Sequence, residues 1–383
     1  MREVLDELLR WWRAGDPVGV ASVIATSRSA PRTAGATLLV GPGGRAVGSV
    51  SGGCVEAAVY ELAREVAVSA KPVLARYGVT GGDDPFAIGL TCGGTLDVYV
   101  ERVDRRTFPE LGGIAASVAR QEPVAVVTCV SCTAPGRSRL GRRLVVRTDR
   151  TTGTLGGERL DLAVAQDARG MLARGGSGTL RYGLDGRRTA EELTMYVASY
   201  APRPRMLVFG AIDFAAAVAR IGGFLGYRVT VCDAREVFTT PERFPGADDV
   251  VVQWPHRYLA AEAAAGRIDS RTVICALTHD PKFDVPLLDV ALGLPVAYVG
   301  AMGSRRTQAD RVRRLRDAGV PQERIALLSA PIGLDIGAGT PEETAVSIAA
   351  EIVRARRSGS GRPLSTLTDQ PIHRTAWTGA PPV

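Results

Sequence analysis

Two patterns of apolar and polar residues divide this chain. In its first part, short apolar runs over residues 18–25, 36–40 and 95–103 predict strands, and glycine-rich stretches separate them. Residues 1–13 and 54–68 instead have apolar residues at helical spacing. These elements predict an N-terminal α+β domain over residues 1–120.

A second, more regular pattern follows the linker at residues 202–204. Six apolar runs, most of them separated by segments of helix length, span residues 205–210, 228–233, 249–253, 272–277, 295–300 and 324–329. Apolar strands that alternate with helices are typical of a parallel sheet with helices on both faces. The pattern predicts a Rossmann-like, doubly wound α/β domain over residues 201–358. A capping box at Thr340, Pro341 and Glu343 marks the start of its last helix.

Two further segments have weaker patterns. Residues 121–200 contain short β-like runs between glycine-rich turns, which predict a β-rich middle segment to which we assign no chemistry. Residues 359–383 are rich in Gly, Ser, Pro and Thr, a composition that predicts a disordered tail.

Composition narrows the classes of function. The net charge is +7, but the basic residues are scattered, aromatics make up only 5% and no nucleic-acid-binding motif is present, so we expect no nucleic-acid partner. No apolar run approaches the ~18 residues that cross a bilayer, and the acidic start does not resemble a signal peptide. We therefore expect a cytoplasmic protein without a membrane partner, whose six cysteines are reduced.

In the predicted parallel sheet, a ligand is expected beyond the carboxyl ends of the strands. Gly210 follows the first strand, and Asp233 and Arg235 follow the second, where a ribose-binding acid is expected. Ile212, however, stands where a dinucleotide fingerprint needs glycine, and Asp213 adds a negative charge beside it. These two residues disfavour a standard NAD site. In the structural alternative, Gly210 only turns the chain and Asp213 caps a helix.

Two other strand-end loops carry candidate ligand contacts. His279 and Asp280 follow the fourth strand and suit a metal ligand, a proton shuttle or a phosphate contact, with a capping role as the alternative. Gly333, Asp335 and Gly337 belong to the glycine-rich loop 330–340, which we expect to wrap the ligand unless it is a plain mobile loop.

The loop after the fifth strand combines small residues with two cations. It contains Gly300, Gly303, Ser304, Arg305 and Arg306, which come at the expected start of a helix. Amides, a hydroxyl and guanidinium groups at a helix start are suited to phosphate, whereas the alternative is a pair of solvated surface arginines.

Cysteines at glycine-rich turns are the candidates for reactive chemistry. Cys54 follows Ser51, Gly52 and Gly53 at a strand-to-helix turn, where the helix dipole and exposed amides favour a thiolate. Cys92 lies in a second glycine cluster. For each, a small buried residue is the alternative.

The other four cysteines have weaker claims to chemistry. Cys129 and Cys132 form a single CxxC without a second pair, which disfavours a structural zinc site. Cys232 and Cys275 lie inside predicted strands and are expected in the core.

Taken together, these motifs resemble the XdhC/CoxI family, accessory proteins of molybdenum hydroxylases such as xanthine dehydrogenase and aerobic carbon monoxide dehydrogenase. The resemblance is carried by residues 29–31 and 48–56, by the turn at residues 92–94, by residues 298–307 and by residues 330–343. The chain departs from the family at residues 210–213, which read Gly-Ala-Ile-Asp where the usual pattern is Gly-Ala-Gly-His.

The resemblance implies a maturation factor rather than an enzyme with a turnover of its own. Such a protein binds molybdenum cofactor of the molybdopterin type, protects it while a cysteine desulfurase supplies its sulfur ligand, and delivers it to an apo-hydroxylase. It also implies a homodimer, and sulfur handling or molybdenum coordination by Cys54 and Cys92. The alternative is an NAD(P)-dependent oxidoreductase, for which His279 is the only plausible acid or base in a strand-end loop.

Overall fold

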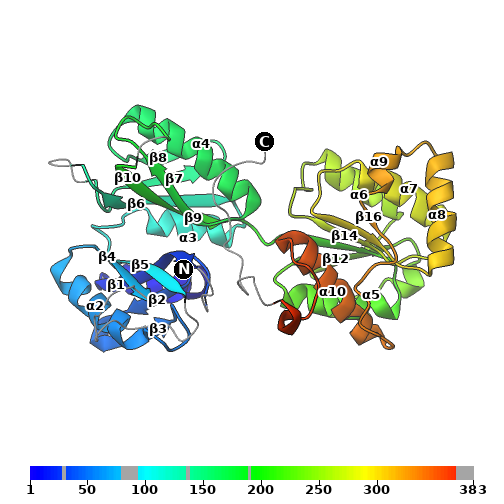
Figure 1. Ribbon diagram of the computed structural model, residues 1–383, viewed down its shortest axis with the longest axis horizontal. Helices are drawn as coiled ribbons and strands as arrows, with labels where there is room; N and C mark the ends of the chain where they lie inside the picture. Colours follow the sequence, from blue (N-terminus) through cyan, green and yellow to red (C-terminus); the bar gives the residue numbers. More distant parts are fainter. Residues whose placement is uncertain (28–31, 79–93, 135–138, 189–190, 368–383) are drawn as a thin grey trace. The chain divides into compact units, whose positions relative to one another are not determined.

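The chain forms two compact units, Met1–Pro202 and Arg203–Leu367 (Figure 1). This computed structural model describes residues 1–27, 32–78, 94–134, 139–188 and 191–367. Among these residues, no helix has both the length and the apolar character needed to cross a membrane.

The first unit contains two modules of the same design. Module A comprises α1 (Leu5–Ala14), β1 (Val18–Ser27), β2 (Thr37–Val40), β3 (Ala46–Gly48), α2 (Glu56–Ser69), β4 (Val73–Gly78) and β5 (Thr95–Val103). Its antiparallel sheet has the order β3-β2-β1-β5-β4, and α2 packs on β1, β2 and β5. The expected α+β fold of this region is confirmed.

Module B repeats this arrangement. It comprises α3 (Leu111–Ala119), β6 (Val124–Cys132), β7 (Arg143–Arg147), β8 (Thr151–Gly153), α4 (Glu158–Arg174), β9 (Gly178–Tyr182) and β10 (Leu193–Tyr200). The sheet order is β8-β7-β6-β10-β9, and α4 packs on β6, β7 and β10. Each element of module B therefore takes the place of its counterpart in module A.

The details of strand pairing repeat as well. β1 has a bulge between Val23 and Ala25 where it pairs with β5, and β6 has the equivalent bulge where it pairs with β10. Beside these bulges, the amide of Gly35 donates to the Val23 carbonyl and that of Gly141 to the Cys129 carbonyl, both at 2.8 Å. Because both sheets have the same bulge at the same point, we infer that the two modules are repeats of one unit and that their common strand order is not a coincidence.

Helix α4 was not predicted from the sequence. Its buried side chains, among them Leu160, Val164, Ala168 and Met171, recur at helical spacing, which is the signal that the surrounding glycines obscured. The five strands of module B agree with the β-like runs expected there.

The two sheets of the first unit pack against each other through related residues. Tyr99 of β5 and Tyr196 of β10 lie in one buried cluster with Ile24 and Val130, the residues at the two bulges. Elsewhere in this interface, Arg143 of β7 forms a buried ion pair with Glu101 of β5. Loss of either partner would leave an uncompensated buried charge between the modules.

The second unit is a parallel α/β domain. Its strands are β11 (Arg205–Phe209), β12 (Arg228–Asp233), β13 (Asp249–Val252), β14 (Val273–Ala276), β15 (Tyr298–Ala301) and β16 (Leu328–Ser329), in the order β13-β12-β11-β14-β15-β16. Its main helices are α5 (Asp213–Phe224), α6 (Pro255–Ala264), α7 (Pro281–Leu292), α8 (Arg305–Asp317), α9 (Gln322–Ile325) and α10 (Pro341–Arg357). Helices α5 and α10 share one core with the sheet, and α6 to α9 share the other. The predicted doubly wound fold is confirmed.

Two details of this unit bear on the sequence-based expectation. Residues 324–329 were expected as a strand, but Gln322–Ile325 is helical and only Leu328–Ser329 joins the sheet. The capping box before α10 is confirmed: the Thr340 hydroxyl accepts from the Glu343 amide, and the Glu343 carboxylate accepts from the Thr340 amide.

Candidate functional site

The strand-end loops of the second unit are aligned along one edge of the sheet. Backbone hydrogen bonds continue past the strand ends, from Leu277 N to Phe209 O (2.7 Å), from Met302 N to Ala276 O (2.8 Å) and from Ile332 N to Ala301 O (3.0 Å). Strand order reverses between β11 and β14, the position where open α/β sheets bind ligands. The candidate residues predicted in the C-terminal domain are therefore brought to this carboxyl edge.

Asp233, expected as a ribose-binding acid, is engaged within the protein. Its buried carboxylate accepts from the Ala211 amide at 2.7 Å and from the Arg235 guanidinium at 2.7 Å. Burial acts to raise the pKa of Asp233, but the hydrogen bonds from Arg235 and Ala211 outweigh it and hold that pKa below its usual value. In this structure Asp233 fixes the turn after β11.

The turn at residues 210–213 follows local packing rather than a dinucleotide fingerprint. Gly210 has φ +118°, and a Cβ there would lie 3.0 Å from the Leu277 carbonyl carbon. Ile212 packs against the core below α5. Asp213 was weighed as a helix cap, which is wrong: it is the first residue of α5, its side chain is 86% exposed, and it pairs with Arg243 at 3.2 Å.

His279 and Asp280 separate in role. Asp280 is the N-cap of α7, where its carboxylate accepts from the Lys282 amide at 3.0 Å. His279, directly before it, is exposed at the strand-end loop. The structure thus gives Asp280 a capping function and leaves His279 as the group that faces solvent.

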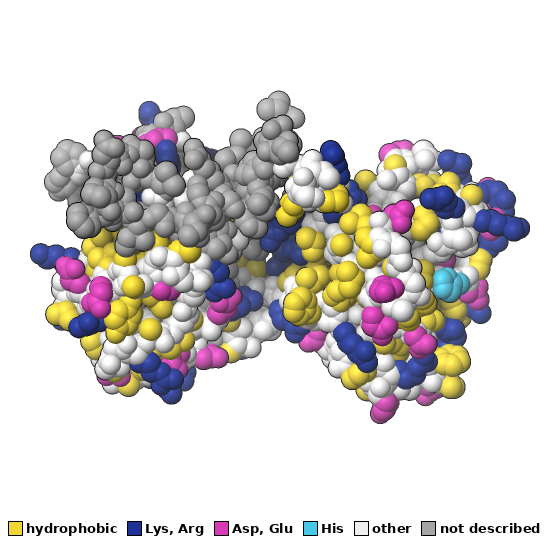
Figure 2. Space-filling view, turned by 60° about the horizontal axis from the view of Figure 1, so that its bottom comes forward, with side chains coloured by type: hydrophobic (Ala, Val, Ile, Leu, Met, Phe, Trp, Pro, Cys, Tyr) yellow, Lys and Arg dark blue, Asp and Glu magenta, His cyan; other side chains and the backbone are white. Residues whose placement is uncertain are grey.

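The arginine loop, residues 302–306, has the expected helix start. Arg305 and Arg306 are the first residues of α8 and are exposed, while the hydroxyl of Ser304 accepts from the Thr307 amide at 3.1 Å as the N-cap. On the face of the second unit that Figure 2 shows, arginine and lysine side chains are interspersed with acidic and apolar ones. The two guanidinium groups of this loop are accessible to an anion.

A buried ion pair beneath this loop was not predicted. Arg311 of α8 donates to the Asp284 carboxylate at 3.0 Å and to the Met302 carbonyl at 2.7 Å. The Thr278 hydroxyl donates to the same carboxylate. Arg311 and Asp284 therefore connect the loops after β14 and β15. Because α8 contains several arginines, the sequence did not indicate that this one is buried and paired.

The glycines of the last two loops have packing reasons. A Cβ at Gly300 would lie 2.5 Å from the Ile332 side chain, and one at Gly333 would lie 2.5 Å from the Ser347 hydroxyl. The buried Glu351 carboxylate accepts from the Gly333 amide at 2.7 Å. In loop 330–340, Pro331 and the outer residues 335–340, which include Asp335 and Gly337, are exposed.

In the first unit, Cys54 is exposed and lies just before α2. The second predicted cysteine, Cys92, and residues 29–31 of the N-terminal motif lie outside the described residues. Cys232 and Cys275 are buried in the second unit, which confirms them as core residues, and this burial raises the pKa of each to about 12.

The loop that carries Cys54 is organised by Glu56. Its carboxylate accepts from the amides of Ser51, Gly52 and Gly53, each at 2.8 Å, and from the Ser49 hydroxyl at 2.7 Å. The amides predicted to bind a ligand therefore already hold an internal anion. Sequence reasoning overlooked Glu56, although its place at the helix start was a usable signal.

Module B has the same loop without the thiol. Asp161 accepts from the Thr154 hydroxyl at 2.6 Å and from the Leu155 amide at 2.7 Å, as Glu56 does in module A. Six residues lie between Thr154 and Asp161, and none of them is a cysteine. Because the loop architecture persists without a thiol, Cys54 is not needed to form it.

No group of three or more His, Cys, Asp or Glu side chains that would hold a metal ion occurs within the described ranges.

Comparison with known families gives matches in both units. A model of the XdhC Rossmann domain matches residues 206–352, and a model of the XdhC and CoxI family matches residues 11–78 and 117–183. The latter two segments cover corresponding parts of modules A and B. Together the matches include well over half of the chain.

Three curated proteins are similar to the chain. A protein of Bacillus subtilis (strain 168) named as a probable xanthine dehydrogenase subunit is 26% identical over 88% of this chain and 93% of that protein. Molybdenum cofactor insertion chaperone PaoD of Escherichia coli (strain K12) is 24% identical over 90% of this chain and 85% of that protein. Uncharacterized protein YqeB of the same strain is 29% identical over 57% of this chain, which spans only 41% of YqeB.

Among solved structures, a crystal structure described as a xanthine dehydrogenase from Bacillus halodurans matches with a TM-score of 0.66. It is 24% identical and covers 95% of this chain and 99% of the other. At this identity the match supports the fold.

The loop around Cys54 gives a prediction about pH. Burial acts to raise the pKa of Glu56, but hydrogen bonds from the Ser51 and Ser49 hydroxyls and from loop amides outweigh it and hold that pKa far below its usual value. A carboxylate with a depressed folded-state pKa stabilises the fold above its unfolded pKa of about 4.5, and this stabilisation is lost as the pH falls further. Glu56→Gln should lower the free energy of unfolding by about 1–2 kcal/mol at pH 7.

Thermal or denaturant unfolding of both proteins between pH 7 and pH 3 measures this difference. It should shrink below about pH 4.5, where the carboxyl of the unfolded wild-type chain takes up a proton while that of the folded protein stays charged. The control is Glu61→Gln on the exposed face of α2, which should change stability little. A Glu56→Gln deficit that is the same at pH 7 and pH 3 would contradict the role of the charge.

Proposed function

Because the chain belongs to the XdhC and CoxI family, we propose that it binds a molybdenum cofactor of the molybdopterin type, protects it and inserts it into a molybdenum hydroxylase. The family and the relatives support a role in the maturation of xanthine dehydrogenase or a related enzyme. The observation that carries the proposal is the likeness to PaoD, named as an insertion chaperone, over 90% of this chain.

The carboxyl edge of the second unit fits the phosphate of such a cofactor. Arg305 and Arg306 are exposed at the start of α8, where helix amides and guanidinium groups favour an anion. Around them, Arg311 and Asp284 hold the loop in place. In the proposal, Gly303 and Ser304 complete the phosphate contact, and Asp335 and Gly337 are exposed on the loop after the neighbouring strand β16.

The first unit supplies a thiol. Cys54 is exposed beside the start of α2, and a thiolate is a soft ligand for molybdenum or a carrier of sulfur. We propose that Cys54 acts in one of these ways and that Cys92 assists it. Since Glu56 already occupies the loop amides, the contribution of this loop is the sulfur rather than an anion site.

The arrangement at the switch point favours this proposal over an NAD(P)-dependent oxidoreductase. The carboxylate of Asp233 is bonded to Ala211 and Arg235, and Ile212 occupies the position that a pyrophosphate-binding turn leaves to glycine. A dinucleotide would have to displace these internal contacts. We propose an apo-hydroxylase and a cysteine desulfurase as partners, a homodimer as the assembly and the cytoplasm as the location.

The direct test is mass spectrometry of the ligand released from the full chain after purification under reducing, oxygen-free conditions from cells that make molybdenum cofactor. We expect a pterin with bound molybdenum. Titration with NADP provides the competing outcome: micromolar binding, about −8 kcal/mol, with no pterin recovered, would replace this proposal by the oxidoreductase.

Arg305→Ala should weaken cofactor binding by about 1.5–3 kcal/mol, roughly tenfold to a hundredfold, because a charge-assisted hydrogen bond to phosphate is lost. Thermal unfolding should be unchanged, since the side chain is exposed. Arg313→Ala is the matched control, because Arg313 lies on the same helix and pairs with Asp310 on its surface. Equal affinities of both variants would exclude the arginine loop from the site.

Cys54→Ser should fold normally but fail to support activation of the partner hydroxylase, because serine keeps the size and loses the soft sulfur ligand. Activity of the hydroxylase co-produced with each variant measures this effect. Cys132→Ser is the control for loss of a thiol elsewhere in the same unit. Full hydroxylase activity with Cys54→Ser would show that the Cys54 thiol is not needed for activation.

A further inference from the structure

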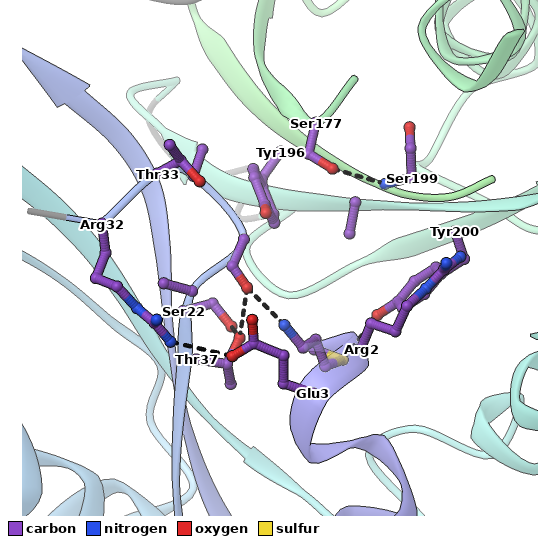
Figure 3. A pocket seen from close by; sticks show the side chains of 15 residues that line it. Arg2, Glu3, Ser22, Arg32, Thr33, Thr37, Ser177, Tyr196, Ser199 and Tyr200 are labelled. Atoms are coloured by element: carbon purple, nitrogen blue, oxygen red, sulfur yellow. Dashed lines mark hydrogen bonds and ion pairs between the residues drawn. The ribbon is translucent and has the colours of Figure 1, made fainter. Parts of the chain in front are cut away.

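A cavity of about 450 Å³ lies between the sheets of modules A and B (Figure 3). Its walls include Ser22 of β1, Thr37 of β2, and Tyr196 and Ala198 of β10. The volume is in the range of sites for small organic ligands. The cavity is separate from the Cys54 loop and belongs entirely to the first unit.

The repeat explains why a cavity exists at this place. In the register of the two sheets, Thr37 corresponds to Arg143, and Ala198 corresponds to Glu101. Thr37 pairs with Ser22 of β1 in module A, and Arg143 pairs with the equivalent Thr128 of β6 in module B. Likewise, Glu101 pairs with Val20 of β1, and Ala198 pairs with the equivalent Val126 of β6. Gly35 and Gly141 are equivalent in the same way. A Cβ on Gly35 would lie 3.6 Å from the Tyr196 hydroxyl, and a Cβ on Gly141 would lie 3.7 Å from the Tyr99 hydroxyl.

The two equivalent places are filled differently. In one, Arg143 and Glu101 form a buried ion pair, and the guanidinium lies 4.2 Å from the centre of the Phe108 ring. In the other, Thr37 and Ala198 have short side chains, and the space beside them is lined by Met1 to Glu3, with the Met1 amine donating to the Gly35 carbonyl at 2.5 Å. A site that is packed in one copy and hollow in the other indicates that the hollow copy accommodates something else.

Arg2, Glu3 and Arg32 are the charged side chains that line the cavity, and Arg2 donates to the Ala201 carbonyl. Arg32 and Glu3 point toward one another across it and pair at 3.0 Å (Figure 3). The Glu3 side chain is 76% exposed and so has unused acceptor capacity. Within the described part of the chain, the buried Nε of Arg32 has no hydrogen-bond partner. An unsatisfied buried donor is costly, and a ligand with an acceptor would satisfy it.

We propose that this cavity binds the pterin ring of the cofactor through its 2-amino-4-oxo edge, an inference that rests on the proposed function for the choice of pterin. This edge presents two N–H donors beside one carbonyl acceptor. The Glu3 carboxylate accepts from the two donors, and Arg32 donates to the carbonyl. Tyr196, which is buried in the wall, offers an aromatic surface for the ring. Guanine has the same edge and is the other source of this chemistry.

The test of recognition uses the full chain and stable ligands. Equilibrium dialysis with 6-hydroxymethylpterin should show binding, whereas 6-hydroxymethyllumazine, with an oxygen in place of the 2-amino group, should bind at least about tenfold more weakly because it faces Glu3 with an acceptor. Guanosine monophosphate is the second arm. Equal binding of pterin and lumazine, or no pterin binding at millimolar concentration, would overturn the proposal, and preference for guanosine monophosphate would overturn the choice of pterin.

Glu3→Gln should reduce pterin binding by about tenfold or more and abolish the preference over lumazine, because a carboxamide cannot accept from both donors. The control Glu61→Gln also removes a carboxylate from an exposed pair, with Arg64, and should leave binding unchanged. Thermal unfolding checks that each variant is folded. Retained pterin selectivity in Glu3→Gln would contradict the assignment of Glu3.

The repeat offers a second variant. The double substitution Thr37→Arg with Ala198→Glu places in the cavity the same pair that fills its counterpart, so the protein should fold while pterin binding is lost. Pterin binding at wild-type strength in this folded variant would place the site elsewhere. If it does not fold, Ser22→Leu narrows the same wall, and the same loss of binding is expected.

Failure of the two proposals can be told apart. If the purified protein carries molybdenum cofactor but Glu3→Gln and the filled variant carry the same amount, the cavity assignment is wrong and the proposed function stands. If free pterin binds with the expected selectivity while no molybdenum cofactor is recovered and hydroxylase activation is unaffected, the cavity stands as a pterin site and the proposed function is wrong.

Discussion

Carboxylates that accept backbone N–H groups hold the loops that carry the candidate site residues, and the loop of module B that corresponds to one of them. Glu56 holds the Cys54 loop, Asp161 holds its counterpart in module B, and Asp233 and Glu351 hold two loops at the carboxyl edge of the Rossmann sheet. A backbone N–H that is buried without a hydrogen-bond acceptor costs free energy, and a loop lacks the regular backbone acceptors that a helix or sheet provides. Each internal carboxylate also occupies the place where an external anion would otherwise bind. The groups that can reach a ligand are therefore side chains that extend beyond the stabilised backbone, such as the Cys54 thiol and the guanidinium groups of the arginine loop.

The repeat in the first unit separates structural from functional positions. Both modules keep the sheet order, the bulge and a carboxylate in the first turn of the main helix that accepts from an amide of the loop before it. They differ at Cys54, which has no cysteine counterpart in module B, and at the inter-sheet position that is Thr37 in module A and Arg143 in module B. Differences between otherwise equivalent positions are where a duplicated fold can gain a site without loss of stability.

Elements with a local pattern were predictable from the amino-acid sequence. Strands of the second unit, the capping box at Thr340 and the core positions of Cys232 and Cys275 could be predicted, because apolar periodicity and capping chemistry act over a few residues. The XdhC/CoxI family was also recognisable from motifs. Only the tertiary structure decided what those motifs do: that Asp233 bonds to Ala211 and that Glu56 fills the amides before α2.

The repeat and the cavity also required the tertiary structure. The likeness of modules A and B lies in strand order and register, which depend on pairings between distant segments. The cavity arises where Thr37 and Ala198 meet across two sheets that no local pattern brings together. Short-range patterns determine elements, whereas the partner of each polar group is decided by which elements come into contact.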